Sequence, residues 1–244
     1  MKVAVILPAA GLGTRMNKVW AEKAGTSRKQ FMLLEGSPIL VHTVRKFAAA
    51  SQVSEIVVAV RGEDTEWVGE MLAAEFPGDR VRVVEGGDSR QESVEKALAR
   101  IHPDTDLVAV HDAVRPFIDL ETIYKVFDEA AETGAAIVGV PAVDTVKQVS
   151  RGTGHVRIRA TLPREKLVMA QTPQVFRHDL LRRAFDLARV DGFVGTDESS
   201  LVERMDVEVS VVMGSDRNIK ITKPGDMDLA RLYFQAEIAK EAVS

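Results

Sequence analysis

The alternation of short apolar runs with longer amphipathic segments is the feature that most restricts the fold of this chain. Near-continuous apolar stretches of strand length lie at residues 3–7, 56–60, 81–84, 107–110, 136–140 and 207–213. Such runs suit strands that are buried on both faces, as in a parallel sheet covered by helices. Amphipathic segments lie at residues 39–50, 65–75, 91–101, 121–133, 179–188 and 224 to about 239. The pattern predicts an α/β fold with an open, doubly wound, mainly parallel twisted sheet.

Helix start signals support these segments. Asp64, Asp119 and either Asp88 or Ser89 stand where helix N-caps are expected, because their side-chain oxygens can accept from unpaired backbone N–H groups. Pro224 suits the first position of the last helix.

Residues 144–172 depart from this rhythm. Strand-like pieces at 146–149 and 156–158 flank the sequence SRGTG at 150–154, which has the chemistry of a hairpin turn. We therefore expect residues 144–172 to form a β-arm that projects from the sheet. The chain has no internal repeat, so we expect residues 1–244 to form one domain with this arm.

Composition excludes several classes of function. The net charge of −4 argues against a nucleic-acid binder, whose affinity rests on a basic face. The absence of cysteine excludes disulfides, thiolate metal sites and cysteine nucleophiles. Neither a secretory signal nor a transit peptide is recognisable, and no apolar run approaches the roughly 20 residues that span a bilayer. We expect a cytoplasmic protein.

The loop after the first predicted strand carries the strongest functional signal. Residues 8–16 read PAAGLGTRM, and Gly11 and Gly13 allow backbone N–H groups to approach a phosphate closely. A dinucleotide fingerprint or a P-loop starting at Gly11 would need glycine at Met16, so both alternatives fail. By itself G-x-G is weak, because a tight turn would leave the same pattern.

Cations follow this loop at Arg15 and in the triplet RKQ at residues 28–30. Together, residues 9–16 and the later KQF at 29–31 resemble the signature of sugar-nucleotide pyrophosphorylases and cytidylyltransferases. In that group the loop wraps the nucleoside triphosphate. The resemblance implies that Ala9, Ala10, Gly11 and Gly13 contact the nucleotide, and that Lys29 is the conserved lysine of the signature.

A second glycine segment, GGDSRQESV at residues 86–94, leads into a predicted helix. A glycine turn before a capped helix would account for it, but it also resembles the segment with which cytidylyltransferases recognise the pyrimidine. Gly87, Asp88 and Ser93 are then the positions that match contacts to cytosine.

The sequence HDAVRPF at residues 111–117 ends the fourth predicted strand. A carboxylate at the tip of a central strand suits a Mg²⁺ ligand or an anchor for ribose, although Asp112 could also be a turn cap. We take His111 as structural. The pattern His-Asp-Ala-x-Arg-Pro, which includes Arg115, resembles the hallmark of the 2-C-methylerythritol 4-phosphate cytidylyltransferases.

Three further segments extend this resemblance over about residues 3–224. VPAVDTVK at 140–147 and AQTPQVF at 170–176 resemble the start and end of that family's arm, and DRNIKITKP at 216–224 resembles its C-terminal signature.

The resemblance implies that CTP and 2-C-methyl-D-erythritol 4-phosphate give the cytidine diphosphate alcohol and pyrophosphate, as part of isoprenoid biosynthesis. Arg15 and Lys29 would stabilise charge on the α-phosphate and the leaving pyrophosphate. Mg²⁺ would bridge triphosphate oxygens, with Asp112 and Asp216 as its protein ligands.

The same resemblance assigns the acceptor site and the assembly. Arg164 and Lys220 would hold the attacking phosphate, supported by Thr145, Arg115 and Thr172. In the family the arm packs against a second subunit. Thr145 and Arg164 would therefore reach the partner's site in a homodimer.

Two alternatives remain open at this point. A ribitol 5-phosphate cytidylyltransferase shares the motifs at 111–117 and 172–174, and Val114 and Phe117 favour it, whereas DTVK at 144–147 favours methylerythritol phosphate. A non-enzymatic nucleotide sensor on the same fold is the other alternative. Retention of Arg15, Lys29, Asp112 and Lys220 argues against a sensor.

Overall fold

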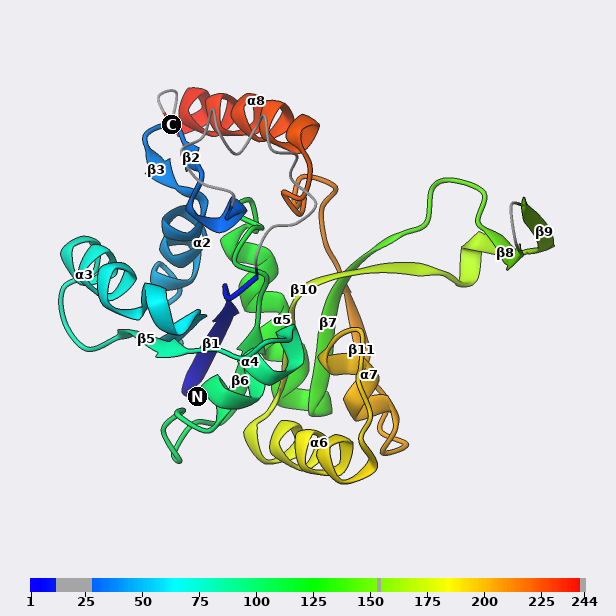
Figure 1. The fold of residues 1–244 in the computed structure, drawn as a ribbon, viewed down its shortest axis with the longest axis horizontal. Helices are drawn as coiled ribbons and strands as arrows, with labels where there is room; N and C mark the ends of the chain where they lie inside the picture. The colour runs from blue at the N-terminus through cyan, green and yellow to red at the C-terminus, as the bar shows by residue number, and fades with distance from the viewer. Residues whose placement is uncertain (12–27, 153–154, 242–244) are drawn as a thin grey trace.

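The computed structural model describes residues 1–11, 28–152 and 155–241 (Figure 1). Its main sheet has the strand order β11-β7-β10-β6-β1-β4-β5. The strands are β1 (Val3–Pro8), β4 (Val53–Val60), β5 (Val81–Glu85), β6 (Leu107–Val110), β7 (Ala135–Pro141), β10 (Val168–Arg177) and β11 (Ser210–Met213). All six predicted strands are present, although the last begins at Ser210 rather than at 207.

Helices cover both faces of this sheet. They are α2 (Ile39–Ala48), α3 (Thr65–Glu75), α4 (Arg90–Leu98), α5 (Leu120–Thr133), α6 (His178–Asp191) and α7 (Glu198–Glu203). The last helix, α8 (Pro224–Glu241), packs instead beyond the carboxyl ends of the strands. No helix in the described part of the chain is both long and apolar enough to cross a membrane.

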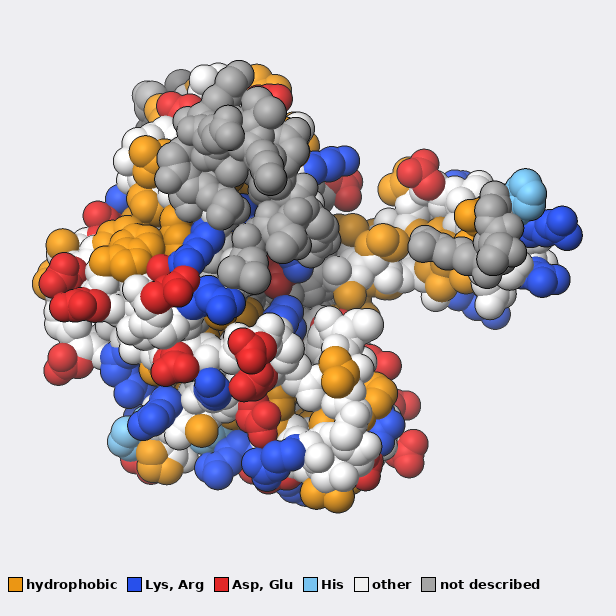
Figure 2. Space-filling model, in the orientation of Figure 1, with side chains coloured by type: hydrophobic (Ala, Val, Ile, Leu, Met, Phe, Trp, Pro, Cys, Tyr) orange, Lys and Arg blue, Asp and Glu red, His pale blue; other side chains and the backbone are white. Residues whose placement is uncertain are grey.

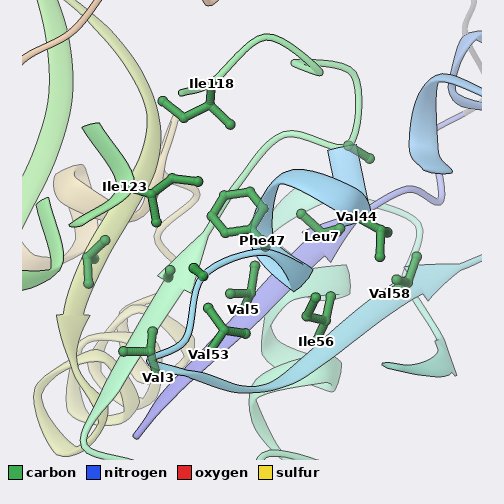
Figure 3. Packing of buried hydrophobic residues seen from close by; sticks show 14 of the residues in the cluster. Val3, Val5, Leu7, Val44, Phe47, Val53, Ile56, Val58, Ile118 and Ile123 are labelled. Atoms are coloured by element: carbon green, nitrogen blue, oxygen red, sulfur yellow. The ribbon is translucent and has the colours of Figure 1, made fainter. Parts of the chain in front are cut away.

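The two faces of β1 show why the sequence folds in this way. Val3, Val5 and Leu7 are fully buried in a cluster with α2, α3 and α5 (Figure 3), whereas Ala4 and Ile6 are buried against α4, α6 and α7. Successive side chains of a strand point to opposite faces, so a continuous apolar run supplies both layers. The predicted doubly wound α/β fold is therefore confirmed.

Strand β10 was not predicted. It runs antiparallel between β6 and β7, whereas β1–β4, β1–β6, β4–β5 and β7–β11 are parallel pairs. Its middle, Gln171-Thr172-Pro173-Gln174, is too polar to resemble a buried strand, and its register with β7 breaks between Ala170 and Gln174. The break accommodates Pro173, which has no N–H to donate to a ladder.

A hairpin of β8 (Lys147–Gly152) and β9 (His155–Thr161) projects from the sheet, followed by the short helix η3 (Arg164–Lys166) (Figure 1). The projecting β-arm is thus present. Its predicted end was wrong, because Val168–Ala170 already pair with β7 and Thr172 lies within β10 of the main sheet.

The C-terminal segment returns to the carboxyl ends of the strands. Ile221 and Met227 are buried with Met32 and Leu34, close to the small hairpin of β2 (Leu33–Leu34) and β3 (Ser37–Pro38). Ile221 N–H also donates to the Val114 carbonyl at 3.0 Å. These contacts bring the segment before α8 next to the 111–117 motif.

The helix N-caps are those predicted from the sequence, with one exception. Ser89 accepts from the Glu92 N–H and Asp119 from the Thr122 N–H, as expected of N-caps. The prediction for Asp64 was wrong: its side chain makes no cap bond, and its carboxylate instead contacts Arg28 and the Trp67 indole N–H. The short helix η2 (Gly62–Asp64) precedes α3 and removes the extended backbone that a cap needs.

Candidate active site

A pocket of about 170 Å³ lies at the carboxyl ends of the central strands. Its described lining comes from the loop after β1, the short helix η1 (Lys29–Phe31), the loop between β5 and α4, and the segments around Asp112 and Lys220. The chain moves from β5 to β6, on the other side of β1, so the strand order reverses here. Open α/β sheets bind ligands at such a point.

The loop after β1 and the loop between β5 and α4 both carry glycines, and they touch each other at the edge of this pocket. A Cβ atom added to Gly86 would lie 2.9 Å from the Ala10 Cβ and 2.9 Å from the Ser93 Oγ. No side chain fits at that distance, so glycine is required for the loops to approach. The contact places Ala9, Ala10 and Gly11 opposite Gly87 in one pocket.

The side chain of Gln30 holds the loop after β1 in place. Its buried Nε2 donates to the carbonyl oxygens of Ala9 at 2.6 Å and Gly11 at 3.2 Å. Those bonds hold helix η1 against the loop, which places the neighbouring Lys29 in the lining of the pocket.

The second loop is held by the start of α4. Ser93 Oγ accepts from the Gly87 N–H at 3.0 Å and donates to the Ser89 carbonyl at 2.8 Å. The Asp88 N–H donates to Glu92 Oε2 at 2.9 Å. Ser93 therefore shapes the loop, and the exposed Asp88 side chain is available to a ligand in the pocket.

Asp112 lies where three cations converge. Its Oδ1 is 3.3 Å from Arg90 Nε, and its Oδ2 is 3.2 Å from Arg115 Nε and 2.9 Å from Lys220 Nζ. Burial opposes the ionised form, but Arg90, Lys220 and Arg115 hold the pKa of the Asp112 carboxyl well below its usual range. The carboxylate is thus a shared counter-ion for cations from three separate segments.

A second pocket of about 190 Å³ adjoins the first and shares Arg90, Asp112 and Lys220 with it. Its other walls come from β10 and from the loop before α7; the remaining lining residues are Arg115, Ala170, Gln171, Thr172, Gln174, Thr196 and Asp197. This pocket exists because the polar middle of β10 lies beside β6. Two ligands bound in the two pockets would meet at Asp112.

His111 and Thr172 fix the backbone of Asp112. The Asp112 N–H donates to Thr172 Oγ1 at 3.0 Å, and this oxygen is 3.1 Å from His111 Nδ1. Burial lowers the pKa of His111 to about 4, so its ring is neutral near pH 7. The structural role expected for His111 agrees with this position.

The chain as a whole is similar to proteins of known family. The model of the family described as IspD, 2-C-methyl-D-erythritol 4-phosphate cytidylyltransferase, matches residues 3–236. The chain belongs to this family. A curated relative of that name from Solibacter usitatus is 78% identical over the full length of both chains, and one from Acidobacterium capsulatum is 54% identical over 96% of this chain and 98% of its own.

Solved structures agree with this assignment. The 4-diphosphocytidyl-2C-methyl-D-erythritol synthase of Anaerococcus prevotii superposes with a TM-score of 0.81, at 26% identity and 96% coverage of both chains. The 2-C-methyl-D-erythritol 4-phosphate cytidylyltransferase of Francisella tularensis gives a TM-score of 0.78, at 32% identity, covering 95% of this chain and 99% of its own. The chain is an enzyme, a nucleotidyltransferase.

Most of the predicted site residues meet in the two pockets. Those in the lining are Ala9, Ala10, Gly11, Lys29, Gly87, Asp88, Ser93, Asp112, Arg115, Thr172 and Lys220. Gly13 and Arg15 lie outside the described residues. Thr145 and Arg164 are exposed on the arm and line neither pocket; Arg164 Nη1 donates to the Val143 carbonyl at 2.6 Å.

The described residues hold no ready-made cage for a metal ion. No group of three or more histidine or acidic side chains in the described ranges could hold a metal ion. Both Asp112 oxygens already face cations, and the exposed Asp216 lines neither pocket. The assignment of Asp112 and Asp216 as metal ligands stays a prediction.

Sequence reasoning gave no site role to Arg90 or Glu198. Arg90 lines both pockets and pairs with the buried Glu198. The arginine within the 86–94 segment was a usable signal, since a cation directly after a phosphate-type loop is placed to meet an anion. Glu198 belongs to the segment DESS at residues 197–200, which also follows the family pattern, but nothing in that segment shows that its glutamate is buried against Arg90.

Proposed function

We propose that this enzyme transfers CMP from CTP to 2-C-methyl-D-erythritol 4-phosphate, which gives 4-diphosphocytidyl-2-C-methyl-D-erythritol and pyrophosphate. The observation that carries the proposal is the junction of the two pockets at Asp112 and Lys220. A nucleotide pocket built from glycine loops lies directly beside a pocket with cationic walls. The family membership agrees with this reaction.

The first pocket suits the nucleotide. The Ala9 N–H already donates to the Ala59 carbonyl at 2.7 Å, so the backbone N–H groups of Ala10 and Gly11 are the ones placed to approach phosphates. On the other side, Gly87 and Asp88 present polar groups to the pyrimidine edge, and Ser93 holds that loop in shape.

The second pocket suits the phosphate of the sugar alcohol. Lys220 and Arg115 place their charges at its wall. Arg115 is also anchored to the backbone, because its Nη1 donates to the Asn218 carbonyl at 2.7 Å. Asn218 in turn donates from Nδ2 to the Thr172 carbonyl at 2.9 Å. A phosphate there would compete with Asp112 for these cations.

The chemistry is an in-line substitution at phosphorus. A phosphate oxygen of the acceptor forms a bond to the α-phosphorus, the bond from that phosphorus to the bridging oxygen breaks, and pyrophosphate leaves. No covalent enzyme intermediate is needed, because the nucleophile is already an anion. At an effective dielectric of about 20, like unit charges about 4 Å apart repel by roughly 4 kcal/mol. Cations and positioning therefore supply the catalysis.

Lys29 is placed to stabilise charge on the triphosphate, and we assign the same role to Arg15, which lies outside the described residues. We propose that Mg²⁺ enters with CTP as part of the substrate. Mg²⁺ usually binds through one or two carboxylates together with substrate phosphates, so it needs no cage of protein side chains.

We propose further that residues 1–244 act as one domain, that this domain forms a homodimer through the arm, and that Thr145 and Arg164 reach the partner's site. Support comes from exposed apolar side chains on the arm, including Val156 at 66% exposure and Ile158 at 65% (Figure 2). An isolated hairpin is only marginally stable in water, so this surface favours a partner. The cytoplasmic location stays a prediction.

The test is pyrophosphate release from CTP in the presence of Mg²⁺. We expect release with 2-C-methyl-D-erythritol 4-phosphate and much less with ribitol 5-phosphate. Release with ribitol 5-phosphate alone would favour the other cytidylyltransferase. CTP binding without release for either alcohol would favour a sensor.

A further inference from the structure

Glu198 is a buried carboxylate that the proposed reaction does not use. It opens helix α7, is only 1% exposed and lines neither pocket. Its Oε1 and Oε2 lie 2.7 and 2.9 Å from Arg90 Nη1. Burial raises the pKa of the Glu198 carboxyl, and the Arg90 guanidinium works against that rise.

Arg90 connects this carboxylate to the junction of the pockets. While Nη1 is held by Glu198, Nε faces Asp112 Oδ1 at 3.3 Å. The other oxygen of Asp112 faces Lys220 and Arg115. Each end of the Asp112 carboxylate thus has its own cationic partner, and this arrangement fixes the rotation of the group.

Glu198 is itself held by contacts that do not depend on Arg90. Its backbone N–H donates to Gln174 Oε1 at 3.1 Å, and Gln174 Nε2 donates to Asp197 Oδ2 at 2.8 Å. Gln174 is part of β10 in the main sheet. The backbone of Glu198 is therefore attached to the sheet beside the second pocket, and from this fixed position its carboxylate reaches Arg90.

Stability alone does not account for this arrangement. Burying the Glu198 charge costs several kcal/mol of desolvation, and apolar replacements of buried ion pairs are often neutral or stabilising. A pair that connects directly to the site has a different use, since it can hold a guanidinium in one orientation.

We propose that Glu198 is a positioning residue: it acts through Arg90 to orient the Asp112 carboxylate, and thereby Lys220 and Arg115, for the acceptor phosphate. This inference rests on the proposed function. Without the Glu198 charge, Arg90 is released toward Asp112 and competes there with Lys220. The acceptor pocket then loses its arrangement, while the loops that hold CTP stay intact.

The first test is Glu198→Gln, which keeps the size of the side chain. We expect kcat/KM for the methylerythritol phosphate to fall about 10- to 100-fold, as small misplacements near a reacting centre can do. Binding of CTP alone, measured by calorimetry, should change less than threefold. The matched control is Glu55→Gln, which removes another buried glutamate that pairs with an arginine, Arg82, but lies opposite Ala4 near the start of β1. It should leave both values unchanged.

A double-mutant cycle with Arg90→Gln separates positioning from a merely structural role. If Glu198 acts through Arg90, Glu198→Gln should reduce the activity of the Arg90→Gln enzyme by less than twofold. Losses that multiply would overturn the inference, and so would wild-type kinetics in Glu198→Gln. If that variant fails to fold, Glu198→Asp replaces it. We expect a smaller fall in kcat/KM for the methylerythritol phosphate, and wild-type kinetics in this variant would also overturn the inference.

A crystal structure of the variant gives a readout that does not depend on the reaction. We expect the contact between Arg90 Nε and Asp112 Oδ1 to be lost or rearranged. An unchanged Asp112 carboxylate would overturn this inference alone. Failure of the wild-type enzyme to release pyrophosphate with the methylerythritol phosphate would instead refute the proposed function.

Discussion

Thr172 Oγ1 lies 3.1 Å from His111 Nδ1 and belongs to a chain of hydrogen bonds that ends at Asp112. The other ring nitrogen of His111 determines the direction of this chain. His111 Nε2 is 3.0 Å from the Arg115 carbonyl, which can only accept, so the ring proton is on Nε2. Nδ1 must then accept the Thr172 hydroxyl proton. The Thr172 oxygen is left to accept from the Asp112 N–H.

Thr172→Val should impair both folding and turnover. The substitution keeps the shape but leaves the Asp112 N–H and His111 Nδ1 unpaired in a buried place, at about 1–3 kcal/mol each. We expect a lower melting temperature and a reduced kcat, measured by calorimetry and pyrophosphate release. Thr172→Ser keeps the hydroxyl and serves as the control. If Val and Ser variants have equal kcat, the hydroxyl does not position Asp112.

His111 predicts a pH dependence of stability. Burial lowers its pKa from 6.5 to about 4 in the folded protein, so between these values the unfolded chain binds more protons. Its contribution is complete above pH 6.5 and is lost as the pH falls toward 4, by about 3 kcal/mol at most. Burial also lowers the pKa of His42 and His178, which add to the same trend.

A comparison of variants isolates the His111 contribution. Urea unfolding of His111→Asn between pH 7 and pH 4 should show a shallower loss of unfolding free energy than the wild type. The exposed His102 provides the control, since His102→Asn should follow the wild-type curve. Parallel curves for His111→Asn and the wild type would mean that folding does not lower the pKa of His111.

The sequence predicted the parts of this structure in which local pattern and environment agree. The run Val3–Pro8 is apolar at every position because both of its faces are buried, and the glycine loops follow such strands. Strand β10 was missed because Gln171 and Gln174 line the second pocket, so polar residues occupy a central strand. The pairing of Arg90 with Glu198 depends on tertiary contacts over 108 positions and has no local pattern.

Nucleotide choice should strongly favour CTP. The loops of the first pocket touch where Gly86 meets Ala10, which leaves little room for a purine, and UTP presents an acceptor where cytosine has an amino group. A site that hydrogen-bonds an amino group rejects an analogue that lacks it much more firmly than an apolar pocket can. We expect kcat/KM for UTP, ATP and GTP to be at least about 100-fold below that for CTP. Similar values for CTP and UTP would show that Gly87 and Asp88 do not bind the base.

The final prediction concerns the arm, because Arg164 is exposed there and lines neither pocket of its own chain. Lys29→Ala should lower kcat by roughly 10² to 10³, as loss of one charge-stabilising donor does, and Arg164→Ala should weaken acceptor binding. If Arg164 serves the partner's site, the two variants should complement each other when subunits are exchanged.

In a mixed dimer, one site takes Lys29 from the Arg164→Ala chain and Arg164 from the Lys29→Ala chain, so that site is intact. The other site carries both substitutions. With random exchange about half of the dimers are mixed and half of their sites are intact, so roughly a quarter of wild-type activity should return. The control is a mixture of the Lys29→Ala and Lys220→Ala variants. Because both residues line one pocket of the same chain, every site in the mixed dimer is defective and this mixture should recover no activity. Absence of recovery after verified exchange would place Arg164 in its own subunit's site. A monomer at micromolar concentration, measured by analytical ultracentrifugation, would rule out the role of the arm in assembly.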